Sequence, residues 1–141
     1  MDSGFWACLH GAVIHFPVAL SVFTVICDTI ALCCWSRPVA SRLLAAGGYA
    51  LYLAAIGSVP SVISGLVLTR GNMWGHGALR WHHFFVWPAW GLLVALAFWR
   101  MLRRDAPTRS EHAVSLACVW LMVLLMGGAG HWGGLLTQSY P

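Results

Sequence analysis

Histidine is the residue type in this sequence with the widest range of chemistry. The 141 residues include seven histidines, whose imidazoles can bind a metal ion or haem iron and can exchange a proton near neutral pH. Carboxylates are scarce, and the four present are Asp2, Asp28, Asp105 and Glu111. Only Asp2 is expected on the same side of the protein as most of the histidines, which argues against a pair of acids for general acid–base catalysis. The sequence has neither a Ser-His-Asp set nor a phosphate-binding glycine loop. The expected chemistry is therefore ligand binding by imidazole.

The elements that must position the histidines are membrane helices. Apolar residues make up 60% of the chain and charged residues 9%, whereas a soluble domain carries about 25% charged residues. The mean hydropathy is +0.75. Four stretches have the roughly 20 apolar residues that a span requires, at about residues 9–35, 43–68, 82–102 and 112–136. We therefore expect an all-α protein, an integral membrane four-helix bundle that forms a single domain over residues 1–141.

Arginine predicts how the bundle is oriented in a bacterial inner membrane. The chain has no lysine, and its arginines divide six to two between the loops. The first and third loops carry Arg37, Arg42, Arg100, Arg103, Arg104 and Arg109, and the second carries Arg70 and Arg80. The positive-inside rule then predicts a multi-pass protein with both termini and the second loop on the outer, periplasmic side. No basic stripe is present that would favour nucleic acid as a partner.

Three of the expected helices place a histidine at a similar depth. With a rise of about 1.5 Å per residue, His15 and His131 should lie roughly 5–10 Å below the outer surface, and His82 somewhat shallower. His10 precedes His15 by five residues, which is roughly 140° around an ideal helix. One shared ligand explains this layer better than three independent coincidences. Ordinary residues at the head-group level are expected at His76, His83 and His112.

Haem b is the ligand that the layer favours. Two histidines on facing helices can each offer a ring nitrogen to the iron, and the cores of helix bundles host such sites. We predict His15 and His131 as the first axial pair, because both should lie well inside the bundle. His82 and His10 form the second choice, and four such histidines would allow one haem or two.

Glycines and arginines near the layer fit the same ligand. Gly130 and Gly134 lie beside His131 in a glycine-rich stretch, and small residues let a flat body approach a helix closely. Arg70 and Arg80 are expected at the same membrane face, where a guanidinium can pair with a haem propionate. These four residues are therefore predicted to bind the cofactor.

Two other interpretations remain open. Three or four imidazoles from His10, His15, His82 and His131 could hold copper or zinc, without any need for glycines or propionate partners. Alternatively, the chain is a cofactor-free structural subunit whose histidines form hydrogen bonds between helices. The five cysteines form no C-x-x-C pattern, which argues against covalently attached haem and against a zinc or disulfide framework.

Three short motifs resemble one known family. Residues 10–17, HGAVIHFP, are similar to an opening H-P-x-x-V-H-F-P, and residues 81–84, WHHF, are similar to an H-R-W motif. Residues 130–137, GHWGGLLT, resemble G-H-x-G-G-x-L-T. By these motifs the chain resembles the DUF2231 family of predicted bacterial membrane proteins, in particular its members that accompany c-type cytochromes. Two departures are His83, where arginine is usual, and Gln138-Ser139, where the family pattern continues with His-Gly.

The resemblance implies a role in respiratory or photosynthetic electron transfer. The positions that match the motifs are His10, His15, His82 and His131. We predict a haem-b-binding electron-transfer subunit, and not an enzyme by itself. It would work between a quinol pool or a larger membrane complex and an outer c-type cytochrome, with membrane lipid around it.

Overall fold

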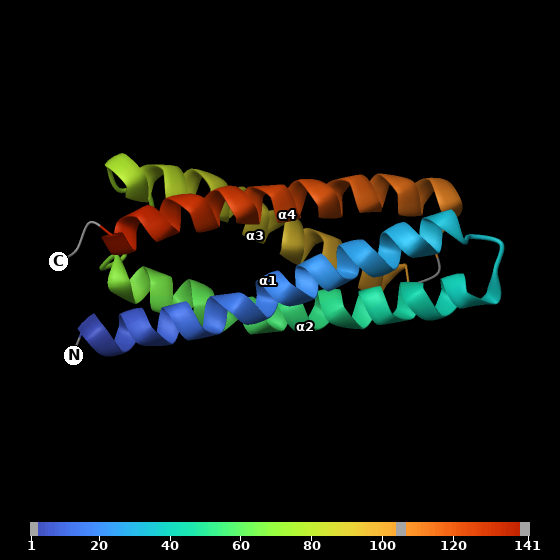
Figure 1. Ribbon diagram of the computed structural model, residues 1–141, viewed down its shortest axis with the longest axis horizontal. Coiled ribbons are helices and arrows are strands. Elements are labelled where there is room, and N and C mark those ends of the chain that lie inside the picture. Colours follow the sequence, from blue (N-terminus) through green and yellow to red (C-terminus); the bar gives the residue numbers. More distant parts are fainter. Residues whose placement is uncertain (1–2, 104–106, 139–141) are drawn as a thin grey trace.

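Four long helices make up the computed structural model, which describes residues 3–103 and 107–138 (Figure 1). The helices are α1 (Ser3–Cys33), α2 (Pro38–Leu68), α3 (Gly77–Leu102) and α4 (Arg109–Gln138). All four are long and apolar enough to cross a membrane, so the prediction of an all-α membrane protein is confirmed. Each helix begins three to six residues before its predicted span, because helices continue beyond the apolar stretch that sequence reading detects. Four residues named from the sequence lie outside the described ranges: Asp2, Arg104, Asp105 and Ser139.

The helices form two antiparallel hairpins. Helix α1 packs along α2, and α3 packs along α4, whereas contacts from α1 to α4 and from α2 to α3 are much sparser. Both chain ends and the α2–α3 connection lie at one end of the bundle, which we call the termini end (Figure 1). The α1–α2 and α3–α4 turns lie at the other, the hairpin end. In Figure 1 the two hairpins converge toward the hairpin end and diverge toward the termini end.

Local sequence explains where the helices start and how they are joined. Pro38 occupies the first turn of α2, where its missing N–H costs nothing. Helix α4 follows a capping box, because Thr108 N donates to Glu111 Oε2 (2.8 Å) and Glu111 N donates to Thr108 Oγ1 (3.3 Å). In the α2–α3 connection Gly71 has a positive φ of 76°, a conformation that glycine adopts without strain.

The middle of the bundle is closed by an apolar core to which all four helices contribute. Its buried members are Val25, Leu51, Ala54, Leu93, Leu96, Ala97, Val119 and Met122. Alanine lets neighbouring helices approach closely here, as is typical of helix contacts in membranes. The core therefore separates the two ends of the bundle, which differ in what they bury.

The hairpin end buries a polar cluster drawn from three helices. Arg100 Nη2 on α3 donates to both carboxylate oxygens of Asp28 on α1, at 2.8 Å each, and the two side chains are only 2% and 0% exposed. His112 on α4 is also fully buried, and its Nε2 donates to the backbone oxygen of Asp28 at 2.9 Å. The ring of Trp35 lies against His112, with centroids 5.4 Å apart. These contacts tie α1, α3 and α4 together.

This cluster corrects two sequence interpretations. Arg100 was counted as a loop arginine, but it lies within α3 and is paired with Asp28. Arg42, Arg80 and Arg109 also lie within helices, but each is near a helix start beside a connection. With the buried Arg100 left out, the arginines in or next to the connections divide five to two, so the asymmetry is retained. The expectation that His112 is an ordinary head-group residue is wrong, since its side chain has no exposed surface. Sequence reading placed it at the start of a span but could not show that Asp28 would face it.

Candidate functional site

A cavity lies between the two hairpins at the termini end. Its volume is about 160 Å³, it is partly open to the outside of the chain, and all four helices contribute to its walls. Sites for drug-sized ligands typically measure about 300–1,000 Å³, so a larger ligand would extend through the opening or move the two hairpins apart. The polar groups on its walls include three imidazoles and two hydroxyls, from His10, His82, His83, Ser58 and Ser61. The remaining lining is mostly apolar, so this cavity is the candidate site.

His82 on α3 is held by a bond that sets its tautomer. Its Nδ1 lies 2.8 Å from the backbone oxygen of Ala129 on α4. A carbonyl oxygen only accepts, so Nδ1 must carry the hydrogen. The second ring nitrogen, Nε2, then has a free lone pair. Histidines that bind metals usually donate their other N–H to a backbone carbonyl in this way.

His10 on α1 is held in an equivalent state by a serine. Its Nδ1 lies 2.9 Å from Ser64 Oγ on α2. The single hydroxyl hydrogen of Ser64 is directed at the backbone oxygens of Pro60 (2.8 Å) and Ser61 (3.0 Å), so Oγ accepts from His10. His10 therefore carries hydrogen on Nδ1 and leaves the Nε2 lone pair free. Two cavity-lining imidazoles from different hairpins are thus prepared as ligands.

Glycines hold both imidazoles in place. A Cβ at Gly65 on α2 would come 3.1 Å from His10 Cε1, and a Cβ at Gly133 on α4 would come 3.2 Å from His82 Nδ1. Both distances are shorter than ordinary contacts, so these positions favour glycine. Of the two glycines named from sequence, Gly130 lines the cavity and Gly134 is exposed with no neighbour within 4 Å of a Cβ. The sequence indicated the glycine-rich stretch but not which members touch a histidine.

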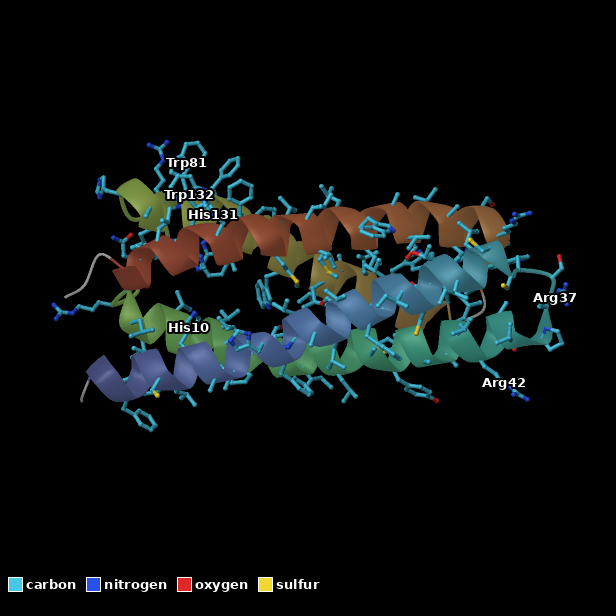
Figure 2. The ribbon with its side chains drawn as sticks, in the orientation of Figure 1. His10, Arg37, Arg42, Trp81, His131 and Trp132 are labelled. Atoms are coloured by element: carbon cyan, nitrogen blue, oxygen red, sulfur yellow. The ribbon has the colours of Figure 1, made fainter. Side chains whose placement is uncertain are left out.

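The expectation that His15 and His131 lie well inside the bundle is wrong, because both side chains are exposed. His15 is roughly 140° around α1 from His10, and His10 is the one that faces α2. His131 is about 200° around α4 from the buried Ala129. Figure 2 shows His131 beside Trp132 on the α3–α4 hairpin and His10 on the other hairpin. Depth was a poor guide, since direction around the helix decides what a side chain can reach.

The two predicted arginines lie at the termini end but not on the cavity wall. Arg70 is exposed in the α2–α3 connection, where it has a positive φ of 51°. Arg80 is exposed near the start of α3, beside a shallow hollow that Trp81 and Phe84 also line. Their pairing with propionates stays a prediction.

The third cavity imidazole, His83, was missed. It was expected at the head-group level, but it is only 5% exposed and its ring centroid lies 5.7 Å from that of His82. Its direction depends on how α3 is rotated against α2 and α4, which no local motif reveals. Within residues 3–103 and 107–138, no three or more His, Cys, Asp or Glu side chains gather as ligands for a metal ion.

The fold and the cavity together define a small multi-pass membrane protein with a histidine-lined candidate site between two helical hairpins. A family model described as a predicted membrane protein, DUF2231, matches residues 7–141. The chain belongs to the DUF2231 family, which confirms the resemblance inferred from its three motifs. No curated protein and no solved structure matches the chain.

Proposed function

We propose that the chain binds haem b in the cavity at the termini end, with His10 and His82 as the axial ligands. The observation that carries this proposal is the state of the two imidazoles. Each Nδ1 is committed to an acceptor, Ser64 Oγ or Ala129 O, so each Nε2 keeps a lone pair for iron. The rings come from opposite hairpins, as a ligand with two axial positions requires.

The lining of the cavity supports a flat, largely apolar cofactor. Besides the imidazoles it includes Trp87 and Trp90, whose rings are in edge contact with centroids 6.3 Å apart, and the aliphatic Val86 and Met126. Haem supplies a one-electron carrier when bound. The chain itself orients the imidazoles, excludes water with apolar side chains, and offers Arg70 and Arg80 at the same end for propionates.

This assignment differs from the sequence prediction in which pair of histidines is preferred as iron ligands. His10 and His82 become the first pair, because they line the cavity and their tautomers suit a metal. His15 and His131 face outward in this chain. A second haem at His15 or His131 would therefore need another protein to supply its remaining contacts.

We further propose that the chain works as an electron-transfer subunit of the bacterial inner membrane. Electrons would pass between a quinol pool or a larger membrane complex and a c-type cytochrome on the periplasmic side. Arginines in or next to the connections, with the buried Arg100 left out, number five at the hairpin end against two at the termini end, which supports a periplasmic termini end. A chain of this size, with short connections, offers little surface outside the membrane, which supports dependence on a partner.

The test is a reduced-minus-oxidised spectrum of the protein purified in detergent, with a pyridine haemochrome assay for stoichiometry. We expect a b-type spectrum and one haem per chain. His10→Ala and His82→Ala should each abolish haem retention, whereas the matched controls His15→Ala and His131→Ala should retain it. Full haem content in both of the first two variants would overturn the ligand assignment.

Two other outcomes would identify the competing functions. Copper or zinc in elemental analysis, without porphyrin, would indicate a non-haem metal protein that completes its ligand set with other groups. A colourless, metal-free protein that is lost from the membrane when a partner is deleted would indicate a structural subunit.

A further inference from the structure

Two polar atoms on the cavity wall are not used by the proposed iron ligands. They are His83 Nδ1 on α3 and Ser61 Oγ on α2, from side chains that are 5% and 9% exposed. Neither atom has a hydrogen-bond partner within the described part of the chain. A buried polar group left unpaired destabilises a protein. Two such groups on one cavity indicate a ligand that supplies hydrogen bonds.

The pair adjoins the two proposed iron ligands, since the backbone of Ser61 is hydrogen-bonded to His10 and the ring centroid of His83 is 5.7 Å from that of His82. His82 and His83 are consecutive, so their side chains leave α3 about 100° apart. His82 is directed at α4 through Ala129, so His83 faces a different part of the cavity. Ser61 is three residues, or about 4.5 Å, deeper along α2 than Ser64, the partner of His10. The two groups therefore define a subsite beside the proposed iron position.

The chemistry of the subsite specifies a neutral ligand with two polar groups. A serine hydroxyl donates or accepts. The other ring nitrogen of His83 donates to the backbone oxygen of Trp74, which leaves Nδ1 as an acceptor. No arginine, lysine, aspartate or glutamate is among the described residues that line the cavity, which disfavours a charged lipid head group. The ring of Trp87 lies against His83, with centroids 5.9 Å apart, and offers an aromatic face for a flat ligand.

We propose that His83 and Ser61 form the head-group site for a membrane quinone and its quinol. A quinone presents two carbonyl acceptors and a quinol two hydroxyl donors on a neutral aromatic ring. Ser61 Oγ can donate to the first and accept from the second, and His83 Nδ1 can accept from a quinol hydroxyl. The cavity is continuous with the outside of the chain, which in a membrane is lipid, where such molecules dissolve. The inference rests on the proposed function, since the haem beside the subsite would be the redox partner.

The test is equilibrium binding of a radiolabelled short-chain ubiquinone analogue to the full chain purified in detergent. We expect saturable binding that His83→Leu and Ser61→Ala each weaken by about tenfold, which corresponds to the loss of one buried hydrogen bond. His83→Asn, which keeps a polar group near Nδ1, should recover part of the affinity. The matched controls His76→Leu and Ser41→Ala, at exposed positions, should bind like the parent chain.

Haem content measured on the same samples separates this inference from the proposed function. The His83 and Ser61 variants should keep their haem and their elution volume, whereas His82→Ala should lose haem but still bind the analogue. Saturable binding with the expected variant pattern in a chain without haem would support the quinone site and refute the haem proposal. Absent binding to the parent chain, or unchanged affinity in both variants, would overturn the quinone site.

Discussion

The two ends of the bundle bury polar groups in opposite ways. At the hairpin end, Asp28 and Arg100 are paired within hydrogen-bond distance and His112 bonds to the backbone beside them. At the termini end, imidazoles line a cavity. Among the described residues His83 Nδ1 and His112 Nδ1 both lack a partner, but His83 lies on the cavity wall whereas His112 packs against Trp35. Ionisable groups within a membrane are costly, and one way to offset that cost is mutual pairing. The first cluster therefore joins the two hairpins, and the cavity at the second is where we propose that a ligand binds.

Both ends of the bundle have glycines packed closely against polar side chains, but the side chains differ. At the hairpin end a Cβ at Gly47 on α2 would come 2.6 Å from Asp28 Oδ1, a carboxylate oxygen already held by Arg100. At the termini end Gly65 and Gly133 lie against imidazoles that no charged group holds. Substitutions at these positions should therefore damage stability at one end and ligand binding at the other.

The largest expected effect is the loss of the buried ion pair. Asp28→Ala leaves Arg100 charged and buried without its carboxylate, and should lower the free energy of unfolding by about 3–5 kcal/mol. His82→Ala, at the termini end, should lower it by less than about 1 kcal/mol in the haem-free chain, because it removes one hydrogen bond. Chemical denaturation of both variants in detergent measures the contrast.

The double variant Asp28→Leu with Arg100→Leu is the control for this contrast. Replacing both partners removes the charges together, so it should be less destabilised than Asp28→Ala alone. A double variant less stable than Asp28→Ala would contradict this expectation. It would show that the ion pair stabilises the protein by more than the cost of burying its two charges.

The second largest loss of stability is expected when a methyl group is added to the packed hairpin end. Gly47→Ala should destabilise the chain by about 3 kcal/mol, near the upper part of the range for an added methyl group in a packed site. The reason is that Asp28 cannot move aside without weakening its bond to Arg100. Gly91→Ala is the matched control in α3, since nothing lies within 4 Å of its Cβ position. Equal melting temperatures for the two variants would show that Asp28 yields to the added methyl group.

The fold was largely predictable from sequence, and the site only in part. Runs of apolar residues in a chain with 9% charge leave no alternative to membrane helices, so the four elements were predicted within a few residues. The predicted depth of each histidine in the membrane stays a prediction. The choice of His15 and His131 as buried residues failed, since the rotation of each helix is set by packing against its neighbours.

The polar partners were hidden for the same physical reason. Asp28 and Arg100 are 72 residues apart, and His10 and Ser64 are 54 apart. Such pairs form only when different helices come into register, and the sequence contains no alternation or motif that reports that register. The spacing between His82 and the consecutive His83 gave no indication that both would line the cavity.

The third prediction compares the loss of stability on replacing two buried histidines, His112 and His83. His112→Leu removes the hydrogen bond to the backbone oxygen of Asp28 and should destabilise the chain by about 1 kcal/mol. His83→Leu removes a bond to the backbone of Trp74, in the exposed α2–α3 connection where water can replace it, so the ligand-free protein should lose less stability than this. Thermal unfolding of both variants, prepared without added quinone, gives the comparison. A larger loss for His83→Leu than for His112→Leu would mean that the termini end is structural.

Gly133→Ala should change stability least of these variants, but it should clearly change the binding site at His82. In Gly133→Ala the new Cβ lies 3.2 Å from His82 Nδ1, so the ring must shift by a few tenths of an ångström and strain its 2.8 Å bond to Ala129. Because the imidazole borders a cavity, it can move, and the free energy of unfolding should change by less than about 1 kcal/mol. The moved Nε2 should nevertheless shift the reduction midpoint of bound haem or weaken its retention.

Gly134→Ala is the matched control, because it lies one residue further along α4 and nothing is within 4 Å of its Cβ position. It should leave the spectrum and the midpoint unchanged. Identical redox titrations for the two variants would show that the position of His82 does not control the ligand.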